Sequence, residues 1–249
     1  MGDYEWAEFA TNLAGRYVEL LSQELVPRLL PRGFQVSPSR SGDDDELRFS
    51  GPLPSFRQLT RVIDIVAEPL RDWMGMTAYA RVVSAEVGEV IGGLPESAQL
   101  TDWADPRAEL GLVDLAGFNS FINAGPYGSF ALRDESSVRG AADWVVLECV
   151  NGPVGEWFSQ RDDLTKLLGL AKYARPRSVD QVNPDAKRLR AAVILCLLNE
   201  RLADAAGLMG WYLGTRRFSV FDSFERASAF DVALGERFPG YAQARALID

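Results

Sequence analysis

Apolar residues recur along the chain with two spacings, and these spacings predict helices and strands. A 3.6-residue period over residues 3–25 predicts a first helix that ends at Pro27. Similar stripes predict helices over residues 55–69, 105–122, 155–171 and 183–206, and two short helices in the tail after an N-cap at Asp222 or Ser223. Residues 77–91 are ambiguous, because a helical stripe there is rich in valine, and we favour a helix.

Strand patterns are shorter, and the strongest one covers residues 143–150. Apolar residues occupy both faces of this run apart from Glu148, and the turn residues 151–155 follow it, so we expect a central strand. Segments near 34–36, 46–49 and 127–132 would complete the sheet. The sequence therefore predicts an α+β fold, with about seven helices packed around a small, mainly antiparallel sheet, in one domain spanning residues 1–249.

Composition is that of a globular protein, and it bears on location. Of the 249 residues, 47% are hydrophobic and 24% are charged, and the longest apolar run, 191–198, is too short to cross a membrane. The first nine residues, MGDYEWAEF, lack the basic end of a signal peptide. Cys149 and Cys196 lie in apolar runs, as buried thiols do in a reducing compartment. We expect a cytoplasmic protein without membrane association.

The absence of histidine excludes several kinds of chemistry. A chain without histidine has no Ser–His–Asp or Cys–His catalysis and no histidine metal site, and two cysteines are too few for a Cys₄ site. The glycine-rich run 125–128 lacks the Lys and Ser/Thr of a P-loop. We therefore expect no metal and no cofactor, and any catalysis would have to use carboxylates, arginine, tyrosine or a lone cysteine.

The net charge of −9 points to the kind of partner. An acidic chain is repelled by nucleic acid and by anionic lipid, so a basic protein is the expected partner. The acidic residues are densest at Asp43, Asp44, Asp45 and Glu46, in a polar loop between two predicted strands. The loop does not have the ligand spacing of an EF-hand. We interpret these four residues as a partner-binding site, and the alternative is a loop that only keeps the hairpin soluble.

A second group of residues surrounds the 151–155 turn. Glu148 and Glu156 flank the turn, and a carboxylate on a buried strand pairs with an arginine, escapes to an edge, or has a raised pKa that suits acid–base chemistry. Trp157 and Arg161 follow at helical spacing, where Arg161 would contact an anion. Two carboxylates facing one cleft are the requirement for glycoside hydrolysis.

These observations lead to three functional hypotheses. The leading one is an acidic cytoplasmic protein-binding protein, such as an immunity protein or inhibitor that masks a basic toxin or nuclease, because complementary charge speeds association with a cationic site. The first alternative is a carboxylate-based hydrolase that uses Glu148 and Glu156. The second alternative is a structural or adaptor module without chemistry.

Overall fold

The protein is described here by a computed structural model. It describes residues 3–38, 46–70, 73–104, 109–121, 130–175 and 182–248. The chain divides into two compact units, unit 1 (residues 1–82 and 115–159) and unit 2 (residues 83–114 and 160–249), and each is described by itself. Helices and a mainly antiparallel sheet confirm the expected α+β class. The single domain stays a prediction.

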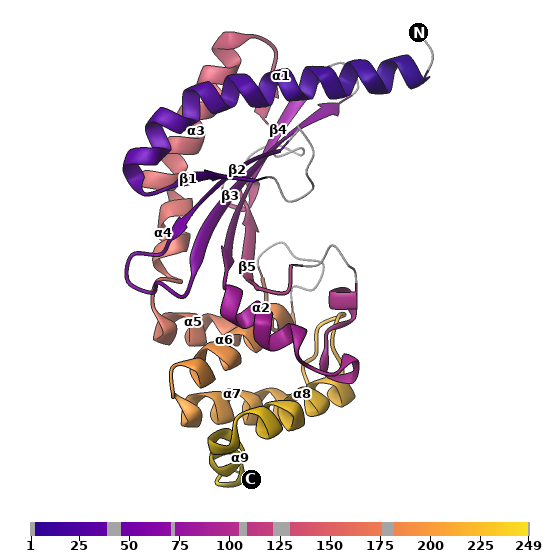
Figure 1. The fold of residues 1–249 in the computed structure, drawn as a ribbon, viewed down its shortest axis with the longest axis vertical. Coiled ribbons are helices and arrows are strands. Elements are labelled where there is room, and N and C mark those ends of the chain that lie inside the picture. The colour runs from indigo at the N-terminus through magenta and orange to yellow at the C-terminus, as the bar shows by residue number, and fades with distance from the viewer. Residues whose placement is uncertain are drawn as a thin grey trace. The chain divides into compact units, whose positions relative to one another are not determined.

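Unit 1 contains two long helices and most of the sheet (Figure 1). Its elements are α1 (Asp3–Leu29), β1 (Gln35–Ser37), β2 (Glu46–Pro52), β3 (Thr60–Leu70), β4 (Trp73–Val83), β6 (Phe130–Leu132), α3 (Glu135–Val150) and α4 (Pro153–Ser159). β5 (Leu112–Gly117) begins in unit 2 and ends in unit 1. The strand order is β1-β2-β3-β4-β5, and β6 pairs antiparallel with β4. Strands expected near 34–36 and 46–49 are thus confirmed. Of the strand expected near 127–132, residues 130–132 are confirmed, and residues 127–129 lie outside the described residues.

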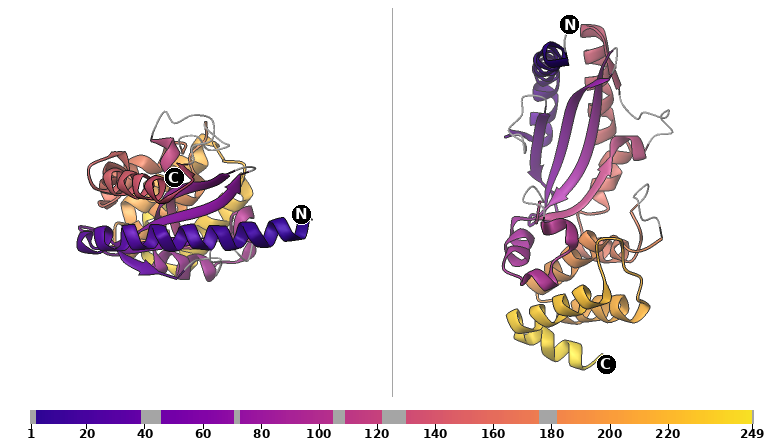
Figure 2. Two further views of the ribbon diagram at one scale, coloured as in Figure 1. Left: turned by 90° about the horizontal axis from the view of Figure 1, so that it is seen from above. Right: turned by 90° about the vertical axis from the view of Figure 1, so that its right-hand side faces the viewer.

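One face of the sheet carries the core of unit 1. Leu47 lies opposite Ile65 and Phe49 opposite Ile63, so the register places four buried apolar side chains on one face. α1 packs on β2 and β3 and also contacts α3 (Figure 1, Figure 2). Its buried stripe follows the predicted helical period: Ala14, Leu21, Leu25 and Leu29. Pro27 lies inside α1 instead of ending it.

The opposite face of the sheet carries a buried ion-pair network. Arg48 on β2 lies opposite Asp64 on β3, and its Nε donates to Asp64 Oδ1 at 2.7 Å. Arg81 on β4 donates from Nη1 to Asp64 Oδ2 at 2.6 Å. Asp64 and Arg81 are both buried. Three strands are therefore joined through one carboxylate, since a buried charge needs partners that compensate its lost hydration.

Residues 143–150 form the last two turns of α3, so the expected central strand is wrong. The helix starts where the Asp134 side chain accepts from the Ser137 backbone N–H and Ser137 returns the bond, which makes a capping box. Trp144 then packs against Phe118, edge to face at 5.4 Å, and stacks on Phe130 at 5.9 Å. These tertiary contacts and the cap outweigh the β-branched composition of the run.

Three further predictions made from the sequence are wrong, because the same apolar residues can form the buried face of a strand or of a helix. Residues 60–70 form β3 and residues 112–117 form β5, where helices are expected. The segment before β3 is a turn and not the start of a helix. A hydrogen bond closes this turn, in which Leu53 N–H donates to Leu59 O at 2.9 Å. Residues 77–91 divide between β4 and α2 (Ala85–Gly92). The Ser84 side chain caps α2 and so separates the two elements.

Unit 2 is mainly helical, and most of its helices come from the C-terminal part of the chain. Besides α2 it contains α5 (Leu164–Ala171), α6 (Ala186–Leu198), α7 (Leu202–Thr215), α8 (Phe224–Arg237) and α9 (Pro239–Ala246). α6 is buried almost throughout and packs against α2, α5 and α7. The predicted helix over 183–206 is nevertheless divided at Asn199, because Glu200 has a left-handed φ of 58°. The two tail helices and the Ser223 cap are confirmed.

We predict that Gly51→Ala destabilises unit 1. A Cβ atom at position 51 would lie 2.1 Å from the backbone oxygen of Gly33, so the backbone must shift, at a cost of about 1–3 kcal/mol. Gly169→Ala is the matched control, since no atom of the described residues lies within 4 Å of its added Cβ on α5. The control should gain about 0.5–1 kcal/mol from helix propensity. Denaturant melts measure both changes, and a neutral Gly51→Ala would contradict this packing.

Candidate functional site

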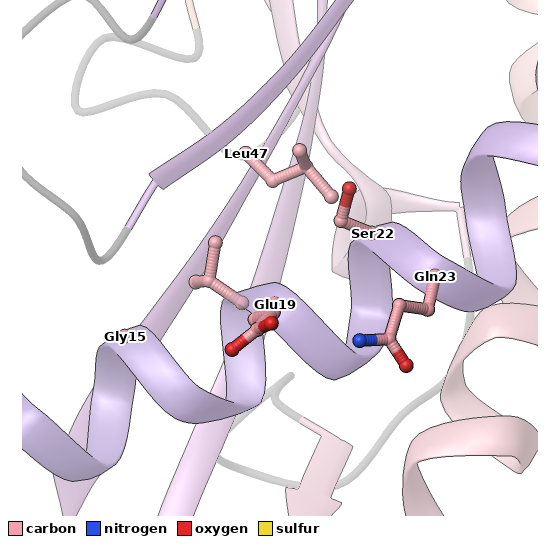
Figure 3. Close-up of a pocket in the computed structure, with 6 residues that line it drawn as sticks. Gly15, Glu19, Ser22, Gln23 and Leu47 are labelled. Carbon is pink, nitrogen blue, oxygen red and sulfur yellow. The ribbon is translucent and has the colours of Figure 1, made fainter.

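A groove between α1 and β2 is the candidate site in unit 1 (Figure 3). Its volume is about 500 Å³. Five lining residues belong to α1 and one to β2: Gly15, Val18, Glu19, Ser22, Gln23 and Leu47. The α1 residues are spaced three and four apart, so they share one face of the helix. The groove therefore runs along the helix.

Small and polar residues give this groove its character. Gly15 and Ser22 lie one above the other along α1, and their small size leaves the space that larger side chains would fill. Figure 3 shows Ser22 pointing toward Leu47, with the polar side chains of Glu19 and Gln23 on neighbouring turns. Glu19 and Gln23 are exposed, whereas Leu47 is buried. The groove thus combines an apolar contact with one carboxylate.

Glu46 is the one residue of the predicted acidic site that the structure describes. Glu46 is the first residue of β2, and its carboxylate lies 3.6 Å from the Arg48 guanidinium. Strand alternation places Glu46 on the ion-pair face of the sheet, opposite to Leu47. Asp43, Asp44 and Asp45 lie outside the described residues.

Glu148 and Glu156 lie on two different helices of unit 1. Glu148 belongs to the last turn of α3, and Glu156 to the first turn of α4. The premise of a carboxylate on a buried strand is therefore wrong. Burial still raises the pKa of Glu148, and its Oε2 atom is buried and accepts no hydrogen bond from the described residues. The negative end of the α3 dipole acts in the same direction.

Trp157 and Arg161, the other two members of the predicted cleft, are buried. The Trp157 side chain is 8% exposed and meets Phe158 edge to face at 5.3 Å, as core aromatics do. Arg161 is 3% exposed, and its Nε donates to Asp114 Oδ2 at 2.8 Å. Arg161 is thus buried and ion-paired within unit 2, which is typical of a structural arginine.

Asp114 is the residue that sequence reasoning missed. It is fully buried at the start of β5, and Arg188 Nη1 donates to its Oδ2 at 3.0 Å, beside Arg161. Arg175 Nε lies 3.6 Å from Oδ1 and also pairs with Asp185 at 2.8 Å. Burial by itself would raise the pKa of Asp114, but the guanidinium groups outweigh it and hold that pKa well below its usual range.

No local signal identifies this cluster in the sequence. Asp114 is 47 residues from Arg161 and 74 residues from Arg188, so neither helical nor strand spacing relates them. Arg188 also donates from Nη2 to Tyr173 O at 2.7 Å, and Asp185 caps α6. The cluster thus connects the start of β5 with the chain before α5, the chain after α5 and the first turn of α6.

The two thiols and the acidic side chains are the groups that a cysteine nucleophile or a metal site would use. Cys149 and Cys196 are buried and free, and burial raises both thiol pKa values, that of Cys196 to about 12. A raised pKa disfavours the thiolate that a cysteine nucleophile needs. Within the described ranges, no group of three or more acidic or cysteine side chains could hold a metal ion. The described helices also include none that is both long and apolar enough to cross a membrane.

We predict that Asp114→Asn costs about 3–5 kcal/mol at neutral pH, because it leaves buried guanidinium groups without compensation. The folded-state pKa of Asp114 is lowered, so its contribution is present above the unfolded pKa of about 3.9 and is lost as the pH falls below it. Denaturant melts from about pH 7 to pH 2 should show a shallower pH dependence for the variant.

Asp204→Asn is the matched control for this prediction. Asp204 also pairs with an arginine, Arg201, at 2.6 Å, but its side chain is 46% exposed. Solvent screening limits such a pair to about 0–1 kcal/mol. Equal effects of the two substitutions would show that the Asp114 cluster does not have the stabilising role described here.

Comparison with known proteins adds no functional assignment to this geometry. No protein-family model, no curated protein and no solved structure matches the chain.

Proposed function

We propose that the protein is a non-catalytic protein-binding protein whose α1–β2 groove receives a basic and apolar segment of another protein. The groove carries the proposal, because Glu19 offers a carboxylate beside the half-buried Val18 and next to Leu47, whose side chain is 6% exposed. An arginine or lysine has a long apolar stem and a charged head, so it can contact both parts at once. Ser22 and Gln23 add hydrogen-bonding groups along the same wall.

The charge distribution supports a basic partner at unit 1. Residues 1–82 and 115–159 contain 17 aspartates and glutamates against 11 arginines, and none of the three lysines. This leaves −6 of the net charge of −9 on unit 1. Asp43, Asp44 and Asp45 come four, three and two residues before the groove residue Leu47 in the chain. Negative charge near a groove attracts a cationic segment at long range and repels acidic ones.

Masking a basic toxin or nuclease is the activity that this chemistry fits best. Such a protein covers a cationic surface by complementary contacts and performs no reaction, so a site without histidine or metal ligands is sufficient. We place it in the cytoplasm, and two buried free thiols support a reducing compartment.

Glu148 favours the hydrolase as a second candidate function. Its raised pKa and its buried Oε2 atom suit a carboxylic acid that donates a proton. Protein binding is better supported than hydrolysis. Trp157 and Arg161, the other residues expected in the catalytic cleft, are buried in other contacts. A Glu148→Gln variant distinguishes the two, since it should leave partner binding unchanged.

We predict that filling the groove abolishes binding without unfolding the protein. Ser22→Phe places a ring toward Leu47, and Glu19→Arg reverses the groove's charge on an exposed position. Wild-type and variant chains serve as baits for affinity capture from the source cell, followed by mass spectrometry. A basic protein retained by the wild type should be lost from both variants. Its retention by Ser22→Phe would contradict the proposal.

Glu236→Arg is the matched control, because it makes the same charge change on an exposed position of α8 in unit 2. This bait should retain the partner. Denaturant melts of Glu19→Arg and Glu236→Arg should agree with the wild type within about 0.5 kcal/mol, as is usual for surface substitutions. The melt of Ser22→Phe checks that this half-buried position still allows folding.

We predict that the acidic run acts mainly on the association rate. Replacing Asp43, Asp44 and Asp45 with Asn should slow association with the captured partner by about tenfold at low salt, because steering depends on long-range charge. Dissociation should change less. The effect should shrink toward about 0.15 M salt, where the Debye length is about 8 Å. Stopped-flow kinetics at two salt concentrations measure the association rate. An association rate that changes neither with the substitutions nor with the salt concentration would exclude steering.

A further inference from the structure

Unit 2 exposes an apolar surface at the connection between α7 and α8. The side chains of Val220, Phe221 and Phe224 are 63%, 43% and 41% exposed. Arg216 and Arg217 are also exposed on this connection, and the Arg216 guanidinium lies 5.0 Å from the centre of the Phe224 ring. We call these five residues the arginine–phenylalanine surface. Clustered exposed apolar side chains with arginine are typical of protein-binding surfaces.

Buried polar contacts fix the backbone beneath this surface. The Asp222 carboxylate accepts from Arg190 Nη2 at 2.6 Å, from the Tyr212 hydroxyl at 2.9 Å and from the Ser223 N–H at 2.8 Å. Arg190 and Tyr212 are fully buried. These contacts hold the backbone at Asp222 in place, next to Val220 and Phe221. A binding surface that is already ordered loses less conformational entropy when a partner binds.

A second anchor joins the surface to a neighbouring pocket. Thr101 donates to Phe221 O from its backbone N–H at 3.1 Å and from its hydroxyl at 3.2 Å. Thr101 also lines a pocket of about 290 Å³, together with Glu96, Gln99, Leu100 and Arg226. Arg226 donates from Nη1 to Gln99 O at 2.8 Å and brings a third positive charge to this region. The pocket can receive one side chain of a bound segment.

We infer that the arginine–phenylalanine surface and this pocket bind a protein segment that carries acidic and apolar side chains. Charge complementarity identifies the occupant, because the surface and pocket contain three arginines, Arg216, Arg217 and Arg226, against two exposed carboxylates, Glu96 and Glu225, on a chain whose net charge is −9. Arginine pairs with carboxylates through two parallel hydrogen bonds, and phenylalanine and valine bury the apolar part. The occupant is opposite in charge to the segment proposed for the α1–β2 groove, so the two sites bind different chemistry.

Peptide selection with the full chain tests the inference. Random short peptides are selected on the wild type and on an Arg217→Glu/Val220→Ser/Phe221→Ser variant, whose substitutions lie at exposed positions. Peptides enriched on the wild type should combine Asp or Glu with Phe, Leu or Trp. Anisotropy measurements on the best peptide should show binding weakened about tenfold or more by the variant. Raising the salt concentration should weaken wild-type binding.

The control is a Lys166→Glu/Val232→Ser variant. Lys166 is an exposed cation of the same unit, and Val232 has the same 63% exposure as Val220. This variant should bind the peptide like the wild type. Enrichment of basic or uncharged peptides, no enrichment, or equal binding by both variants would overturn the inference. Wild-type dimers that the first variant abolishes would also overturn it, because the occupant would then be a second copy of the chain.

Discussion

The buried carboxylate of Asp114 is the constraint on which unit 2 depends. Removing a charge from water costs several kcal/mol, and only a complete set of partners offsets that cost. Arg161, Arg175 and Arg188 supply this set from the segments around α5 and α6. A second aspartate, Asp222, is held by Arg190 and Tyr212 in the same way. Unit 2 is therefore held by specific polar geometry as well as by its apolar core.

Local patterns predicted the parts of the fold whose stability is local. The helical stripe of α1, the Ser223 cap of α8 and the strands β1, β2 and β6 follow from spacing and turn residues. Residues 143–150 were assigned wrongly because their valines fit either a strand or a helix. The capping box at Asp134, several residues upstream, was the available signal for α3. The same ambiguity explains β3 and β5.

The candidate sites show the same limit. Glu46 and its acidic neighbours attract attention by composition, yet residues such as Gly15 and Ser22, which line the groove, are noticeable only once α1 lies against β2. Likewise, Phe221 and Phe224 look like core residues in the sequence, and their exposure depends on contacts of Asp222 with distant residues. Exposure and cavities arise from tertiary structure, so sequence spacing cannot reveal them.

The interleaving of the two units has a consequence for the order of folding during synthesis. Unit 1 is interrupted by residues 83–114, and unit 2 by residues 115–159. The ribosome therefore releases the β1–β4 strands before α3, and releases Asp114 before any of its arginine partners. Neither unit can be completed from one continuous stretch of chain, and such non-local pairing slows folding. While synthesis continues, strand edges and an uncompensated carboxylate stay hydrated and open to chaperones.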